Sequence, residues 1–138
     1  MHTAHILIIE DNRSDVDYIL YGFKKYLLKN ALEVIYDGNA AVDYCRSFSD
    51  QQIVPDLILL DMNLPRVHGI DVLKVFKEHS LLCKVPIVIT TASLTRSAAE
   101  KAVSLGATGI IEKPIKIEKL INLLKEHTSL ELSLVVRD

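Results

Sequence analysis

Three carboxylates in this sequence follow short aliphatic runs, at points where a buried strand would end. Glu10 and Asp11 come directly after the run at residues 6–9, and Asp61 comes directly after the run at residues 57–60. Short apolar runs bounded by turn-forming residues are typical of strands in a parallel sheet, whose carboxyl ends meet at one edge. Neighbouring carboxylates stay ionised together only when cations compensate them. Because all-oxygen ligation with few protein groups suits Mg²⁺, we expect a magnesium site at this edge.

Two further reactive side chains are predicted at the same edge of the sheet. Thr91 ends another apolar run, and Lys113 follows the last one. An aspartate can attack phosphorus and form an aspartyl phosphate if cations neutralise the peripheral phosphoryl oxygens, and we assign Asp61 as this nucleophile. Lys113 would pair with one phosphoryl oxygen and the Thr91 hydroxyl would hydrogen-bond another. Because both contacts form only after phosphate has arrived, Thr91 is predicted to be a sensor as well as a ligand.

The elements that must position these residues alternate between strands and helices. Apolar runs predict strands at residues 6–9, 32–36, 57–60, 85–91 and 109–112. Apolar residues at helical spacing predict helices at about 14–27, 39–48, 69–79, 95–105 and 117–124. Asn39 and Thr95 are expected N-caps, and Gly106 is an expected C-cap. Five strand-helix repeats with short connections require a parallel sheet with helices on both faces, which is a doubly wound α/β fold.

The composition limits the class of protein further. With 138 residues, 49% hydrophobic and 25% charged, the chain is expected to fold as one globular domain. The net charge of −2 and the scattered lysines predict no nucleic-acid binding, and no glycine-rich nucleotide motif is present. The apolar runs are shorter than the ~18 residues of a membrane span, and residues 1–9 do not form a signal peptide, so a cytoplasmic protein without membrane contact is expected. Cys45 and Cys83 form no CxxC pair and are expected to be reduced.

Over about residues 4–127 the sequence resembles the receiver domain of two-component response regulators. The matching features stand in family order and spacing: Glu10-Asp11, Asp61 followed by Asn63, Leu64, Pro65 and Gly69, then Thr91-Ala92 and Lys113-Pro114. The resemblance implies a flavodoxin-like (βα)5 fold, in which a five-stranded parallel sheet has the strand order 2-1-3-4-5. It also implies a receiver domain at residues 1–128, and it leaves residues 129–138 as a C-terminal tail.

The same resemblance implies a role for each site residue. Asp61 would be the phosphoacceptor, and both Asp61 and Asp11 would be direct Mg²⁺ ligands. Glu10 would act largely through water, and Asn63 would offer its backbone carbonyl to the ion. The Lys113-Pro114 peptide bond would be cis, which requires proline.

The phosphodonor in this family is a phosphohistidine on a sensor histidine kinase. The stretches EDNRSD at residues 10–15 and LDMNLPR at residues 60–66 are similar to small stand-alone regulators paired with bacterial and cyanobacterial phytochrome kinases. The predicted function is therefore a stand-alone response regulator that accepts a phosphoryl group on Asp61 with Mg²⁺. It would then change its partner-binding surface and lose the phosphate by hydrolysis, as a switch more than an enzyme.

One position departs from the pattern of the family. The family commonly has Tyr or Phe three residues before the lysine, where this chain has Ile110. Because the aromatic switch lacks its residue, the signal can instead pass through the loop at residues 92–94 and the helix after it, with Ile110 packing. We hypothesise that phosphorylation reshapes the face formed by the fourth helix, the fifth strand and the fifth helix.

The sequence also allows two other functions, and it allows two interpretations of the C-terminal tail. A haloacid dehalogenase-like Mg²⁺-dependent phosphatase also forms an aspartyl phosphate, but it usually needs a second aspartate where this chain has Asn63, which cannot shuttle protons. A phosphorylation-independent interaction module is the second alternative, and the intact acidic, threonine and lysine set weighs against it. Residues 130–136 are either a frayed terminus or an edge strand that packs on the domain or forms a homodimer by exchange.

Overall fold

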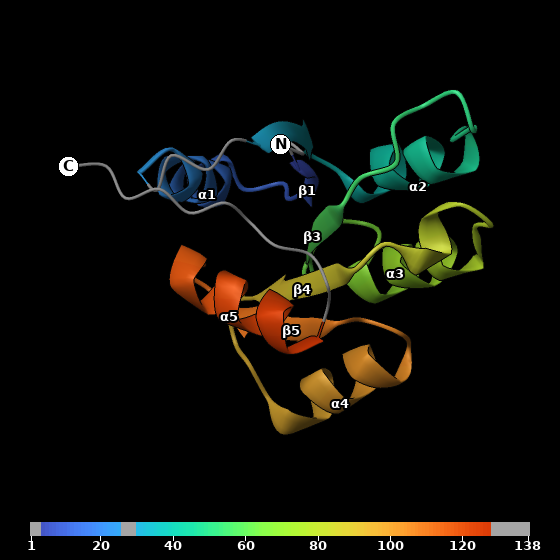
Figure 1. The fold of residues 1–138 in the computed structure, drawn as a ribbon. Coiled ribbons are helices and arrows are strands. Elements are labelled where there is room, and N and C mark those ends of the chain that lie inside the picture. Colours follow the sequence, from blue (N-terminus) through green and yellow to red (C-terminus); the bar gives the residue numbers. More distant parts are fainter. Residues whose placement is uncertain (1–3, 26–29, 128–138) are drawn as a thin grey trace.

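The computed structural model describes residues 4–25 and 30–127 (Figure 1). Within these residues, strands and α-helices alternate, and a short 3₁₀ helix precedes the fourth strand. The strands are β1 (Ala4–Ile9), β2 (Asn30–Ile35), β3 (Leu57–Asp61), β4 (Ile87–Thr91) and β5 (Gly109–Glu112). The helices are α1 (Arg13–Lys25), α2 (Gly38–Arg46), α3 (Gly69–Glu78), η1 (Leu82–Lys84), α4 (Arg96–Ser104) and α5 (Ile117–His127).

The strands form one parallel sheet in the order β2-β1-β3-β4-β5, which confirms the expected topology. Ile9 of β1 lies opposite Leu60 of β3, and Asp61 at the end of β3 lies opposite Thr90 of β4. This register brings the carboxyl ends of neighbouring strands together at one edge, where doubly wound folds bind their ligands.

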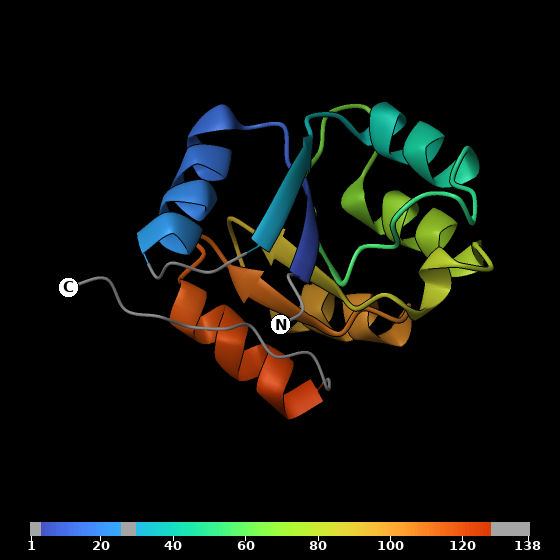
Figure 2. The ribbon, with the colours of Figure 1, turned by 45° about the horizontal axis from the view of Figure 1, so that its top comes forward.

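Aliphatic side chains fill both faces of the sheet, which explains why the strands read as continuous apolar runs. Every residue of β3 and β4 is buried. One face packs against α1 and α5 around Phe23 and Leu120, and the other packs against α2, α3 and α4 around Phe76 and Ala102. Figure 2 shows α1 and α5 together on one side of the sheet, with α2 and α3 on the other. The two cores hold the strand ends, and therefore the site, in a fixed register.

The observed strands differ from the expected ones at several boundaries. β1 begins two residues earlier than expected, at Ala4, and β3 runs one residue further, to Asp61. β2 covers Asn30–Ile35 rather than 32–36. β4 begins at Ile87 rather than at residue 85, because Val85 is the C-cap of the 3₁₀ helix η1 and its N–H donates to the Leu82 carbonyl. The differences in β1 and β4 lie at the amino ends of these strands, β2 is at the edge of the sheet, and β3 still ends where the site is expected.

The helix caps were predicted with one error. The N-cap of α2 is Asp37, not Asn39, because Asp37 is extended and its Oδ1 accepts the N–H of Ala40 at 2.9 Å. Thr95 caps α4 as expected, and Gly106 follows that helix with a φ of +100°. That left-handed conformation favours glycine, so Gly106 ends the helix as expected, one position after the C-cap residue Leu105.

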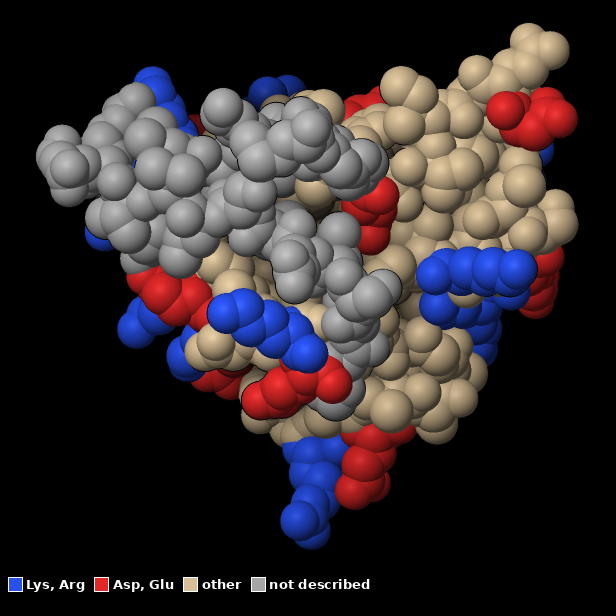
Figure 3. All heavy atoms as spheres, viewed as in Figure 1, with Lys and Arg blue, Asp and Glu red and all other residues tan. Residues whose placement is uncertain are grey.

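The cysteines, the apolarity of the helices and the surface charge were also predicted from the sequence. Cys45 and Cys83 are free thiols. Among residues 4–25 and 30–127, no helix has the length and apolarity needed to cross a membrane. On the face drawn in Figure 3, acidic and basic side chains are interspersed outside the grey atoms. The predicted tail at residues 129–138 lies outside the described residues.

Candidate functional site

The ends of β1, β3 and β5 bring three of the predicted site residues into contact. Asp61 is the last residue of β3, Glu10 follows β1, and Lys113 follows β5. The Lys113 Nζ atom lies 2.6 Å from Glu10 Oε1 and 3.3 Å from Asp61 Oδ1. The side chains of Glu10 and Asp61 are only 2% and 3% exposed, so their attraction to the ammonium is weakly screened by water.

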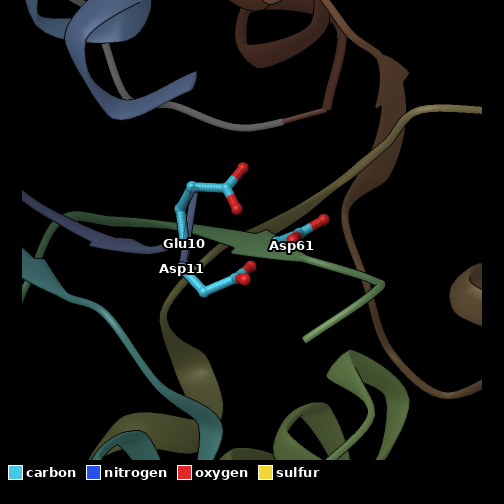
Figure 4. Close-up of side chains that lie close together, drawn as sticks. All are labelled: Glu10, Asp11 and Asp61. Carbon is cyan, nitrogen blue, oxygen red and sulfur yellow. The ribbon is translucent and has the colours of Figure 1, made fainter. Parts of the chain in front are cut away.

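A third carboxylate completes an all-oxygen cluster beside the lysine. Glu10, Asp11 and Asp61 each offer a carboxylate oxygen, and these oxygens lie within 4.8 Å of one another. Figure 4 shows the three side chains grouped at the ends of β1 and β3. Asp11 is exposed, whereas Glu10 and Asp61 are buried, so the cluster opens toward solvent on the Asp11 side. A buried acidic group with one open side is a donor set that fits a hard divalent cation.

Burial and like charge change the acidity of the groups in this cluster. Burial, the hydrogen bond with Asp61 and the charge of Asp61 raise the pKa of Glu10 to about 7, although Lys113 opposes the shift. Burial alone would lower the pKa of Lys113, but hydrogen bonds with Glu10 and Asp15 and the charge of Asp61 raise it overall. Lys113 therefore stays a cation throughout the neutral pH range, while Glu10 takes up a proton easily.

The loop after β3 folds back tightly onto the strand end. The backbone N–H of Asn63 donates to Asp61 Oδ1 at 3.3 Å, and the N–H of Gly69 donates to the carbonyl of Met62 at 2.9 Å. A Cβ atom on residue 69 would clash with the Asp61 carbonyl, so this position requires glycine. The loop thereby orients the Asp61 carboxylate through the Asn63 backbone.

Thr91 ends β4, but its hydroxyl is engaged with the following loop. Its Oγ1 donates to the Ser93 carbonyl at 3.2 Å and accepts the Ser93 N–H at 3.2 Å. One residue later, the N–H of Leu94 donates to Glu112 Oε2 at the end of β5, at 2.8 Å. Thr91 therefore lies at the predicted edge, and a short chain of hydrogen bonds connects its loop to β5.

Asp15 is a fourth carboxylate near the site that was not predicted from the sequence, and it contacts Lys113. Its Oδ2 lies 2.9 Å from Lys113 Nζ, although the two residues are 98 positions apart. The available signal was an acidic residue in the first turn of α1, which is also a common way to stabilise a helix N-terminus. Only the packing of α1 beside the end of β5 gives Asp15 its second role.

Two expectations about β5 and the residues after it are confirmed: Ile110 packs against the core, and the peptide bond before Pro114 is cis. Ile110 is half-buried and packs against the core on the α2, α3 and α4 face. The Lys113-Pro114 peptide bond is cis. Ile110 thus occupies an ordinary packing position on β5, three residues before the lysine.

Residues 6–125 match the family described as the response regulator receiver domain. The probable methanogenesis regulatory protein FilR2 of Methanothrix harundinacea is 31% identical over 122 residues, which cover 88% of this chain and 79% of that protein.

Two solved structures have similar folds and come from regulators of phytochrome signalling. The bacteriophytochrome response regulator AtBRR is 27% identical with a TM-score of 0.79, over 92% of this chain and 94% of that one. The phosphorylated cyanobacterial phytochrome response regulator RcpA is also 27% identical, with a TM-score of 0.74 over 91% of each chain.

Proposed function

The chain belongs to the response regulator receiver domain family, and on that premise we propose that it accepts a phosphoryl group from a histidine kinase on Asp61. Receiver domains are signalling modules in two-component pathways rather than classical enzymes. The observation that carries the proposal is the buried Asp61 carboxylate, with one oxygen 3.3 Å from Lys113 Nζ at the edge where the strand ends converge.

In the proposed transfer, an Asp61 carboxylate oxygen attacks the phosphorus of a phosphohistidine. An O–P bond forms while the P–N bond breaks, and the electron pair of the broken bond returns to the imidazole. Lys113 supplies a fixed positive charge for one phosphoryl oxygen, and the Thr91 hydroxyl can turn from Ser93 toward another. The Asn63 N–H holds the carboxylate in place during the attack.

We further propose that Mg²⁺ is required, with Asp11 and Asp61 as direct ligands, Glu10 acting through water and the Asn63 carbonyl completing the set. The fit rests on charge: Lys113 alone cannot balance three carboxylates whose oxygens lie within 4.8 Å of one another. When bound, the ion would supply positive charge to the phosphoryl oxygens during transfer. The exposed Asp11 leaves that side of the cluster open to an incoming ion and phosphodonor.

Intact-protein mass spectrometry after incubation with acetyl phosphate and Mg²⁺ tests this proposal. The wild type should gain the mass of one HPO₃ group, and Asp61→Asn should gain none. Asp50→Asn, which removes an exposed aspartate from the loop after α2, is the matched control and should behave as the wild type. Omitting Mg²⁺ and adding EDTA should abolish the gain. Equal gains in the wild type and Asp61→Asn would contradict the assignment, and no gain in either would favour a phosphorylation-independent interaction module.

We propose that the phosphodonor is a phytochrome-type histidine kinase. The support is the similarity to AtBRR and RcpA, which extends over at least 91% of this chain, together with the stretch EDNRSD that opens the site. Phosphotransfer from an autophosphorylated bacteriophytochrome kinase should be faster than transfer from a chemotaxis-type kinase at equal concentration. Equal rates with both kinases would remove the support for this partner while leaving phosphorylation of Asp61 intact.

The signal is proposed to leave the site through the loop after β4 and to reach the face formed by α4, β5 and α5. When the Thr91 hydroxyl turns to a phosphoryl oxygen, the Ser93 carbonyl loses its donor, and Leu94 beside it is bonded to Glu112 on β5. Amide chemical shifts of α4, β5 and α5 should therefore change on phosphorylation. Shifts that change only within the loops around Asp61 would contradict this route.

A further inference from the structure

The contact between Asp15 and Lys113 has no part in the phosphotransfer described above. Asp15 lies in the first turn of α1, where its backbone N–H donates to Asn12 Oδ1 at 3.1 Å and so holds the turn in place. Its carboxylate accepts from Lys113 Nζ at 2.9 Å. Asp15 does not belong to the cluster of Glu10, Asp11 and Asp61.

The ammonium of Lys113 is shared between an inner and an outer set of carboxylates. Glu10 at 2.6 Å and Asp61 at 3.3 Å form the inner set and are almost fully buried. Asp15 forms the outer set, and its side chain is 37% exposed. A cavity of about 140 Å³, lined by Asp15, Tyr18 and Lys113 among others, lies on the outer side. Of the three contacts, the one with the phosphoacceptor is the longest.

This division matters because an ammonium in a buried site is drawn strongly toward buried carboxylates. Without an outer partner, the Lys113 Nζ would close onto both inner carboxylates and pair tightly with Asp61. A carboxylate oxygen that accepts a short bond from an ammonium is a weaker nucleophile, since its lone pair is engaged. The Lys113 ammonium, which is proposed to bind a phosphoryl oxygen, would then point toward Glu10 and Asp61 instead of toward the incoming phosphoryl group.

We propose that Asp15 is a positioning residue that holds the Lys113 ammonium outward, so that Asp61 stays open to attack and the ammonium faces the incoming phosphoryl group. This inference rests on the proposed phosphorylation of Asp61. Asp15 lies outside the carboxylate cluster that contains the phosphoacceptor, and it acts through its contact with Lys113.

Rates of phosphorylation by acetyl phosphate in three variants test the proposal. Asp15→Ala removes the outer partner and should slow phosphorylation about two- to fivefold, which corresponds to the loss of one partly exposed ion pair. Asp15→Asn keeps an oxygen that accepts from the ammonium but loses the negative charge, so it should restore part of the rate. Asp17→Ala removes an exposed carboxylate from the same helix and should leave the rate unchanged. A wild-type rate in Asp15→Ala, or an equal loss in the Ala and Asn variants, would overturn the proposal.

The NMR signal of the Lys113 ammonium gives a readout that does not depend on phosphorylation. Asp15→Ala should shift this signal and Asp17→Ala should not, because Asp15 Oδ2 lies 2.9 Å from the Nζ atom, whereas Asp17 is on the exposed side of the same helix. If the wild type itself gains no phosphate, the proposed function is wrong. The ammonium signal then still shows whether Asp15 positions the Lys113 ammonium. An ammonium signal identical in the wild type and Asp15→Ala would overturn the positioning role in either case.

Discussion

Two groups of residues lie at the edge of the sheet that carries the candidate site, and different interactions hold each group together. The first, which we call the charged half, consists of the residues around the lysine: Glu10, Asp61, Lys113, Asp11 and Asp15. Its contacts join the ends of β1, β3 and β5, and the carboxylates of Glu10 and Asp61 are almost fully buried. Charges in such a setting interact strongly, and removing one partner leaves the others uncompensated.

The second, which we call the loop half, consists of Thr91, Ser93, Leu94 and Glu112. Three of these four residues are exposed, and the hydrogen bonds between them involve backbone groups of the loop after β4. Each such bond contributes only ~0.5–1.5 kcal/mol net, because water competes for the same groups. The loop half can therefore rearrange at low cost.

The difference between the halves suits the two tasks that the proposed function would set. A phosphoacceptor site must keep its cation and carboxylates in a fixed arrangement, and strong buried charges do this. The readout must change when one hydroxyl changes its partner, and only weak local bonds allow that. Thr91 lies where the halves meet, since its backbone ends β4 in the sheet and its side chain bonds to the loop.

The largest expected effect comes from removing the cation of the charged half. Lys113→Met should lower the free energy of unfolding by about 3 kcal/mol, because it leaves buried carboxylates of like charge without a partner. Urea denaturation at neutral pH without metal measures this loss. Lys116→Met, which replaces an exposed lysine three residues later, should stay within ~0.5 kcal/mol of the wild type. A loss no larger than that of the control would show that Lys113 does not hold the charged half together.

The charged half should also carry most of the pH dependence of stability. Burial and Asp61 raise the pKa of Glu10 from 4.5 to about 7, so between these values the folded chain retains a proton that the unfolded chain has released. Stability should therefore fall as the pH rises through this window, because the unfolded state binds fewer protons. Glu10→Gln should remove this decrease in metal-free urea denaturation, whereas the exposed control Glu78→Gln should keep it. Parallel curves for the wild type and Glu10→Gln would contradict the assignment.

The sequence predicts the charged half better than it predicts the contacts around it. Asp61 and Lys113 could be placed because apolar runs locate buried strands, and parallel strands bring their carboxyl ends to one edge. Asp15 could not be placed, since its contact with a residue 98 positions away depends on how α1 packs on the sheet. The positive φ of 67° at Arg66 has no signal in the residue type either, because left-handed conformations favour glycine and asparagine.

Local competition between neighbouring residues explains the error at the cap of α2. Asp37, Gly38 and Asn39 are all turn formers, and both Asp and Asn are good N-caps. The choice depends on which residue leaves β2 in an extended conformation, and this is Asp37, with a φ of −155° and a ψ of 148°. Backbone direction after a strand is a tertiary property that composition does not encode.

A smaller and more local effect is expected from the residue where the halves meet. Thr91→Val keeps the shape of the buried side chain and removes the hydroxyl that bonds to Ser93. We expect a loss of about 1 kcal/mol, because the freed Ser93 groups are exposed and can bond to water. Amide chemical shifts should change in residues 92–95 and not at Glu10. Shift changes that extend to Glu10 would show that the two halves are coupled before phosphorylation.

The smallest effect on stability is expected from the bond that ties the loop half to β5. Glu112→Ala removes the acceptor of the Leu94 N–H and should cost only about 0.5 kcal/mol, since Glu112 is exposed. The Leu94 amide should nevertheless exchange faster with solvent, whereas Glu112→Gln keeps an acceptor oxygen and should preserve protection. Phosphorylation of Asp61 should proceed at the wild-type rate in both variants, because the charged half is untouched. If the loop carries the signal to β5, the shift changes that phosphorylation causes at Ile110 should weaken in the Ala variant alone. Equal responses at Ile110 in both variants would mean that the signal reaches β5 by another route.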